Sequence, residues 1–227
     1  MSPEARRILA RIPLPTDQSR REEIASSVTH GTAAFLSLLA AGRLFFALGS
    51  VAQAWHTAIL GLYGVSLPAV FLCSAMYHAT RVLHRKRLFR LLDHASIFFL
   101  IACSYTVVAL IVLEGAVGWT LFGVVWALTL TGLAYKIYFL GKLRVLSVIF
   151  YVLLGWLAIA AAGPLLEAAP AGLLILLILG GGFYTVGTVF FAAKFLPYHH
   201  AVWHLLVLLG SAVHYVAVMR FVVPGAA

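Results

Sequence analysis

The stretch that decides the fold reads Pro197-Tyr198-His199-His200-Ala201-Val202-Trp203-His204-Leu205-Leu206-Val207-Leu208-Leu209-Gly210-Ser211-Ala212-Val213-His214. It opens an apolar run that continues to Val223 and is long enough to cross a bilayer as a helix. Imidazole is costly in hydrocarbon unless it faces a partner, a cavity or a metal. His200 and His204 are four residues apart, so they share the helix face that can offer two nitrogens to one Zn²⁺. The alternative is a pair of interfacial histidines that bond to water or lipid headgroups.

The composition is that of an integral membrane protein. Of 227 residues, 63% are hydrophobic and 10% are charged, and the mean hydropathy of +1.03 excludes an ordinary soluble domain. The apolar runs are continuous rather than alternating, which favours helices over a β-barrel. We therefore expect an all-α, polytopic protein with an N-terminal segment at 1–25 and one seven-helix transmembrane domain at 26–227. The expected spans are 26–49, 55–79, 91–113, 117–139, 145–163, 171–193 and 199–223.

Basic residues are distributed unevenly between the two sides of the predicted bundle. Five lie in the N-terminal segment, five at 81–90 and three at 136–144, and Lys194 joins them, whereas only Arg43 and Arg220 lie on the other side. The positive-inside rule then predicts a cytoplasmic N-terminal segment and an extracytoplasmic C-terminus in the plasma (inner) membrane. Attraction to anionic headgroups explains the pI near 9.9. Membrane lipid, and no nucleic acid, is therefore the expected partner.

The N-terminal segment contains no apolar core of signal-peptide length. We expect the first span to act as its own insertion signal, without a cleaved leader. Ile8, Leu9 and Ile12 stand among arginines, which predicts either a short interfacial turn or a disordered basic tail.

A helix start signal precedes the first span. Ser19 and Glu22 fit the S-x-x-E capping box, so this helix is expected to begin before the membrane. The alternative role for Glu22 and Glu23 is a favourable interaction with the helix dipole and with headgroups. Polar residues then follow one helix face, namely Ser26, His30 and Ser37.

Several polar side chains are predicted at one depth, in the cytoplasmic part of the membrane. They are Ser74, His78, Asp93, His200 and His204. Three imidazoles and one carboxylate suit Zn²⁺, which takes four ligands from histidine nitrogen and carboxylate oxygen. An unpaired Asp93 would be costly in hydrocarbon. The alternatives for Asp93 are an N-cap of the third span or a salt bridge with Arg87 or Arg90.

Other residues are given packing or interfacial roles. Lys136 is expected to extend its ammonium group to the cytoplasmic edge of the membrane. The glycines at 180–182 and Gly187 predict close helix packing or a bend. Cys73 and Cys103 are too few and too buried to indicate a disulfide framework.

The pattern Ser74-x-x-x-His78, Asp93 and His200-x-x-x-His204 resembles the signature of the progestin and adipoQ receptor superfamily. More closely, Glu22-Glu23 followed by Thr29-His30-Gly31, and Ser104-Tyr105-Thr106, resemble its bacterial hemolysin III branch. The resemblance implies seven helices, a cytoplasmic N-terminus and zinc bound by three residues, His78, His200 and His204. It also implies that Ser74 and Asp93 lie beside the metal, with water between. It assigns no role to Glu22, His30, His94 and His214.

Three functions are compatible with these residues. The first is a zinc-dependent hydrolase of a lipid amide or ester in the inner leaflet, because the motif is similar to that of the alkaline ceramidases. The candidate catalytic residues are then Asp93, as proton acceptor, and Ser74, with the oxyanion stabilised by zinc or by Ser74. The second is a non-enzymatic membrane regulator or sensor with a structural zinc. The third, ranked last, is a pore-forming or cytolytic protein. The substrate, the oligomeric state and the fourth zinc ligand, water or Asp93, are left open.

Overall fold

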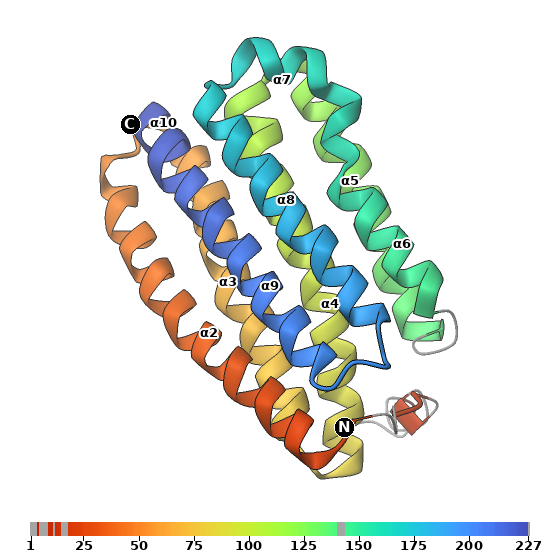
Figure 1. Cartoon of the computed structure of the whole chain (residues 1–227). Helices are drawn as coiled ribbons and strands as arrows, with labels where there is room; N and C mark the ends of the chain where they lie inside the picture. Colours follow the sequence, from red (N-terminus) through yellow and green to blue (C-terminus); the bar gives the residue numbers. More distant parts are fainter. Residues whose placement is uncertain (1–3, 5–8, 11, 15–17, 140–143, 227) are drawn as a thin grey trace.

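The computed structural model describes residues 4, 9–10, 12–14, 18–139 and 144–226. Within these ranges all regular secondary structure is helical, which confirms the all-α prediction. Seven of the described helical segments are long and apolar enough to cross a membrane, again as predicted (Figure 1). They run Arg20–Ser50, Ala54–Ala79, Leu83–Leu113, Gly115–Ile137, Val148–Ala168, Ala171–Ala192 and His199–Val222.

Several spans consist of more than one helical piece. The helices are α2 (Arg20–Ala47), α3 (Ala54–Ala79), α4 (Leu83–Val107), α5 (Gly115–Phe139), α6 (Arg144–Gly155), α7 (Ala162–Ala168), α8 (Ala171–Ala192), α9 (His199–Ala217) and α10 (Val223–Ala226). A 3₁₀ segment at Leu157–Ala161 joins α6 to α7 within the fifth span. Helices α4 and α9 each continue into a π-helical turn, at Val108–Leu113 and Val218–Val222.

Two helices begin earlier than the apolar runs alone predict. The capping box at the start of α2 is confirmed, because Ser19 Oγ accepts the N–H of Glu22 at 3.3 Å and Glu22 Oε2 accepts the N–H of Ser19 at 2.8 Å. Helix α2 therefore starts at Arg20 rather than at residue 26. Helix α4 starts at Leu83 with Val82 as its N-cap, because the basic stretch before the apolar run is helical too. Asp93 lies well inside α4, so the N-cap alternative for Asp93 is wrong.

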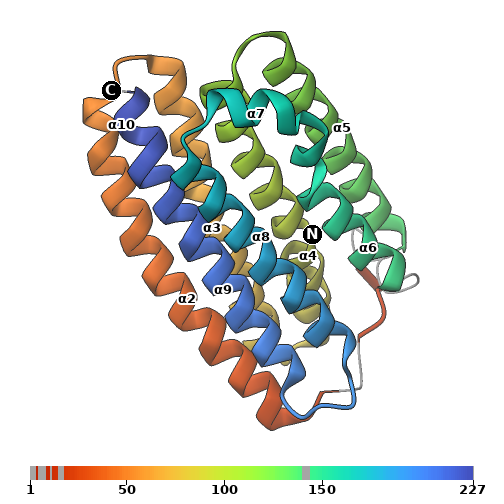
Figure 2. The ribbon, with the colours of Figure 1, turned by 45° about the horizontal axis from the view of Figure 1, so that its top comes forward.

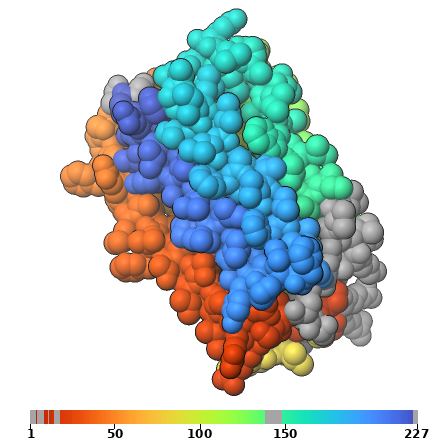
Figure 3. Space-filling model, viewed as in Figure 1, coloured from red at the N-terminus to blue at the C-terminus, as the bar shows by residue number. Residues whose placement is uncertain are grey.

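The helices form one bundle with the starts of α2, α4 and α9 and the end of α3 at the same end (Figure 1). Helix α2 packs against α3 and α9, α9 packs against α8, and α4 lies between α3 and α5 (Figure 2). Figure 3 shows the side chains of α2, α9 and α8 meeting along one face of the molecule. The start of α2 and helix α10 lie at opposite ends of the bundle, as an odd number of spans requires (Figure 1).

Two apolar clusters lie inside the bundle. The larger joins α2, α3, α4, α8 and α9 and includes Leu44 and Phe71. The second joins α4, α5 and the fifth span and includes Phe98, Val125 and Leu154. Because lipid tails are as apolar as these side chains, close packing rather than exclusion of water stabilises the helix contacts. The interior is therefore sensitive to the size of each side chain.

Helices α8 and α9 approach each other through glycines, as the sequence predicts. A Cβ atom built on Gly180 would lie 2.2 Å from the His214 ring, and one on Gly210 would lie 2.9 Å from the Tyr184 ring. His214 Nε2 donates a hydrogen bond to the Leu177 carbonyl at 3.1 Å. His214 therefore links α9 to α8 at a point where a larger residue than glycine does not fit.

Lys136 does not extend to the membrane edge, so that prediction is wrong. The side chain is 3% exposed and its Nζ lies 5.1 Å from the centre of the Tyr151 ring. The ammonium group also interacts electrostatically with the buried carboxylate of Asp93. An attractive ring and a buried opposite charge favour the interior position over the headgroup region. Cys73 and Cys103 are free thiols, as expected.

The described part of the N-terminal segment contacts the bundle. Leu9 and Ile12 are buried and pack against Leu91 of α4. Most of the other predictions on this segment, including those on Ile8, fall outside the described residues.

Candidate metal centre

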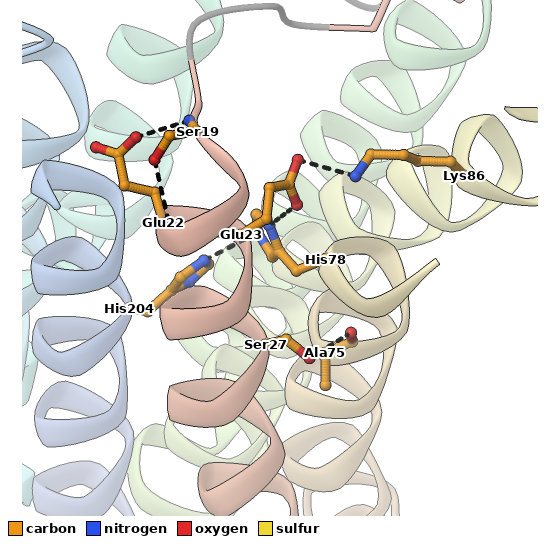
Figure 4. A network of polar contacts seen from close by, with 8 residues as sticks. All are labelled: Ser19, Glu22, Glu23, Ser27, Ala75, His78, Lys86 and His204. Carbon is orange, nitrogen blue, oxygen red and sulfur yellow. Dashed lines mark hydrogen bonds and ion pairs between the residues drawn. The ribbon is translucent and has the colours of Figure 1, made fainter. Parts of the chain in front are cut away.

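His78 is the penultimate residue of α3, where the helix reaches the basic end of the bundle. Its Nδ1 lies 2.9 Å from Oε2 of Glu23, in the first turn of α2 (Figure 4). The other oxygen of that carboxylate, Oε1, accepts a hydrogen bond from Lys86 Nζ at 2.8 Å. Three helices thus meet at Glu23, which fixes the orientation of the His78 ring.

His200 and His204 lie in the first two turns of α9, on one face as predicted. The helix is positioned by Tyr198, whose backbone is left-handed with φ of 57° and whose N–H donates to Glu22 Oε1 at 3.1 Å. His199 Nδ1 lies 3.0 Å from the carbonyl oxygen of Phe190, which ties the start of α9 to the end of α8. The loop before α9 is therefore held to both α2 and α8.

The structure brings together the three histidines named from the sequence. One nitrogen of each of His78, His200 and His204 lies within 4.8 Å of the other two. His78 Nε2 and His204 Nε2 are 3.1 Å apart (Figure 4). Two nitrogens at ~2.0–2.1 Å from one tetrahedral zinc lie about 3.3 Å apart, so this pair has nearly the separation of two ligands of one ion. In the part of the chain that the structure describes, this is the one such group of histidine, cysteine and acidic side chains.

The protonation chemistry of the group also fits a cation. A carboxylate accepts but does not donate, so His78 Nδ1 carries the hydrogen of this contact, and in the neutral ring His78 Nε2 then presents a lone pair toward His204. His200 Nε2 is buried and has no hydrogen-bond partner among the described residues. Histidine ligands of zinc commonly donate their other N–H to a carboxylate, which is the arrangement of Glu23 and His78. These residues therefore fit a bound zinc ion.

Asp93 and Ser74 are buried next to the group. Ser74 lies one turn before His78 on α3 and is 0% exposed, and Asp93 is 4% exposed. The Asp93 carboxylate interacts with His78 and Ser74, and also with Arg90 and Lys136. Asp93 does not belong to the group whose ligand atoms converge. Asp93 thus lies near His78 of the group and also interacts with two buried basic side chains.

Two residues beside the three histidines were not predicted from the sequence to be site residues. Glu23 was assigned to the helix dipole or headgroups, and its contact with His78 depends on how α2 packs against α3. His30 lies on α2 with its ring centre 3.6 Å from that of His204, and neither ring nitrogen has a hydrogen-bond partner among the described residues. The sequence feature that could have indicated His30 is the row of polar residues Ser26, His30 and Ser37 on one helix face. All three side chains are buried. His214 lies farther along α9, against Leu177.

Fold and site together define a class, a multi-pass helical membrane protein with a buried group of three histidines at one end of its bundle. Residues 18–215 match the family described as haemolysin-III related, and the chain belongs to that family.

Individual relatives agree with this placement. The chain is 39% identical over 206 residues to Hemolysin-3 of Bacillus cereus, covering 91% of this chain and 94% of that protein. It is 37% identical over 203 residues to the Hemolysin-3 homolog of Bacillus subtilis (strain 168), covering 89% and 95%. The human Monocyte to macrophage differentiation factor is 28% identical over 173 residues, covering 74% and 71%. This distant similarity is consistent with the progestin and adipoQ receptor superfamily.

Proposed function

We propose that His78, His200 and His204 bind zinc and that the protein is a zinc-dependent hydrolase of a lipid amide or ester. The observation that carries the proposal is the convergence of three histidine nitrogens, with Glu23 bonded to the far nitrogen of His78. A zinc ion held by three histidines supplies Lewis-acid polarisation of a carbonyl and acidifies water to a pKa of about 7. The likeness of the motif to that of alkaline ceramidases supports an amide or ester as the bond that is cut.

Asp93 is the candidate proton acceptor. Its carboxylate is buried and interacts with His78 and Ser74, which supports a role in removing a proton from a water held by the three histidines. The hydroxyl of Ser74 is fully buried at the same place and can donate a hydrogen bond to the oxygen on which negative charge develops. These two groups act on a substrate carbonyl only if it reaches the level of His78.

The position of the site supports a lipid substrate. The three histidines lie at the ends of predicted membrane-crossing helices, near the level at which headgroups and ester or amide linkages of lipids are found. The excess of basic residues at this end of the bundle supports a cytoplasmic N-terminus in the plasma membrane and a site facing the inner leaflet.

A second candidate is a membrane regulator in which zinc is structural. It is favoured by the burial of the ligands, because the side chain of His78 and the whole of His204 are 0% exposed. A structural site requires no route for substrate.

The experiment uses the full chain purified in detergent. Metal content is measured by elemental analysis, and hydrolysis of ceramide and of phospholipid is followed by release of fatty acid. We expect about one zinc per chain, loss of hydrolysis after chelation, and recovery with one equivalent of zinc. Hydrolysis that survives complete removal of the metal would contradict the proposal. Zinc-dependent thermal stability without turnover of any amide or ester lipid would support the structural alternative.

A further inference from the structure

A hollow of about 360 Å³ opens beside His78, between the first turns of α2 and the junction of α3 with α4. Its wall includes three cations, Arg20, Arg81 and Lys86, and it reaches Glu23 and His78. A second hollow of about 470 Å³ shares Arg81 with the first and adds Arg85 to an otherwise mostly apolar wall. The two hollows therefore adjoin at Arg81, and together they are called the Arg81 depression.

The charges in the first hollow do not balance. Glu23 is its acidic residue, and both carboxylate oxygens are already bonded, Oε2 to His78 and Oε1 to Lys86. Among the described residues, no acidic side chain lies within ion-pair distance of Arg20 or Arg81. Two guanidinium groups thus line one hollow without an ion pair to any acidic side chain of the described residues. Guanidinium groups bind phosphate and carboxylate oxygens through paired N–H donors, so the hollow is suited to an anion.

The surroundings of the hollow are apolar. Ile24 and Val28, on the α2 side, are 51% and 62% exposed. Met76 and Val82, in the second hollow, are 45% and 49% exposed. Exposed apolar side chains directly beside arginines are expected where hydrocarbon gives way to headgroups. A free anion in water gains nothing from such a wall, whereas a lipid places its phosphate on the cations and its acyl chains along the apolar side chains.

We propose that this depression is a binding site for an anionic phospholipid of the surrounding leaflet, with its phosphate held by Arg20 and Arg81. Lys86 borders the same hollow while it holds Glu23, and Glu23 holds His78. A lipid in this hollow is therefore next to Lys86, which bonds to Glu23, the residue that orients His78. The site is defined by the cations and the hollow alone, so it does not depend on whether the histidines bind zinc or hydrolyse a lipid.

The test uses purified full-length protein in a neutral detergent. Three probes are titrated: short-chain phosphatidylglycerol, short-chain phosphatidylcholine and glycerol phosphate. The readout is the melting temperature, together with the number of phosphatidylglycerol molecules retained in native mass spectra. Arg20→Gln and Arg81→Gln are compared with Arg43→Gln, which removes the same charge from an exposed position at the far end of α2. Zinc content is measured on every sample.

We expect phosphatidylglycerol to raise the melting temperature of the wild type and of Arg43→Gln at the same concentration. Arg20→Gln and Arg81→Gln should each need about tenfold more lipid for half of that effect, because each loses one charge-assisted contact. Equal stabilisation by phosphatidylcholine or by glycerol phosphate would overturn the proposal, the latter because a small anion would then suffice. The proposal would also be overturned if all three variants lost lipid affinity equally, or if none of them lost any. Zinc content reports only on the histidines. Purified protein that contains no zinc but still responds to phosphatidylglycerol would count against the proposed function and leave the lipid site standing.

Discussion

Nδ1 of His78 and Oε2 of Glu23 lie 2.9 Å apart, across the interface between the end of α3 and the first turn of α2. The contact joins residues 55 positions apart in the chain. It fixes the His78 ring so that Nε2 points toward Nε2 of His204, which brings ring nitrogens of two helices within 3.1 Å of each other. Lys86 balances the charge of the same carboxylate. The first helix of the bundle thus contributes to the candidate metal centre without supplying one of the converging nitrogens.

Replacement of Glu23 by glutamine should weaken zinc binding. The amide keeps the shape of the side chain but is a weaker acceptor for the His78 N–H and loses the ion pair with Lys86. Loss of such an outer partner typically lowers metal affinity about 10–100-fold. The affinity is measured by competition with a chromophoric chelator.

Glu22→Gln is the matched control. The Glu22 carboxylate bonds to the backbone N–H groups of Ser19 and Tyr198 rather than to a histidine of the group. Its loss should lower stability slightly and leave zinc affinity within about twofold of the wild type. Equal affinities for Glu23→Gln and wild type would show that the contact with His78 has no role in metal binding.

Alanine substitutions on α9 test the ligands themselves. His200→Ala or His204→Ala leaves two histidines, so the purified protein should retain much less than one zinc per chain. His84→Ala removes an exposed histidine of α4 and should change nothing. Metal content is measured by elemental analysis after gel filtration. Full zinc content in both α9 variants would remove these residues from the ligand set.

The sequence predicted those parts of the structure that depend on local spacing. His200 and His204 share a face because they are four residues apart, and the apolar runs gave the seven spans. It did not predict the role of Glu23, because an acid at a helix start is explained locally by the helix dipole. Lys136 was wrongly placed at the membrane edge for a similar reason, since only the packing of α5 against α6 and α4 shows the Tyr151 ring and the Asp93 carboxylate that attract it.

Close packing of α8 on α9 predicts a strong effect of a single methyl group. In Gly180→Ala the new Cβ would lie 2.2 Å from the His214 ring, so the ring or the helices must move. Overpacking of this kind costs about 1–3 kcal/mol. Thermal unfolding in detergent should show a clear decrease in melting temperature.

Gly182→Ala provides the control on the same helix. A Cβ at Gly182 meets nothing within 4 Å. Alanine is the better helix former by ~1 kcal/mol, so this variant should be as stable as the wild type or more stable. If Gly180→Ala is as stable as Gly182→Ala, the α8–α9 interface is looser than the structure indicates.

The orientation in the membrane is predicted from the basic residues and can be tested with reporters. A reporter active only outside the cytoplasm should be active when fused after Ala227 and inactive when fused after Arg87, because arginine and lysine favour cytoplasmic loops. A cytoplasmic reporter at the same two positions should give the reverse pattern. Activity of the first reporter after Arg87 would place the three histidines at the opposite membrane face.

The role of Asp93 separates an enzyme from a structural metal protein. Asp93→Asn keeps the size of the side chain and removes the proton acceptor that lies beside His78 and Ser74. If Asp93 acts on water or substrate, zinc should remain bound through the three histidines, while hydrolysis of ceramide or phospholipid should fall by about 10²–10⁴. If Asp93 is the fourth ligand of a structural ion, zinc retention and melting temperature should fall together.

These outcomes are distinguished by measuring zinc content, melting temperature and hydrolysis on the same preparations. Ser96→Ala serves as the control, because Ser96 is buried on α4 near Asp93 and its hydroxyl donates to the backbone carbonyl of Asp93 at 2.8 Å rather than to the carboxylate. It should keep both zinc and turnover. We expect Asp93→Asn to keep zinc and lose turnover, since the carboxylate lies outside the converging group of ligand atoms. Undiminished hydrolysis by Asp93→Asn would mean that another group accepts the proton.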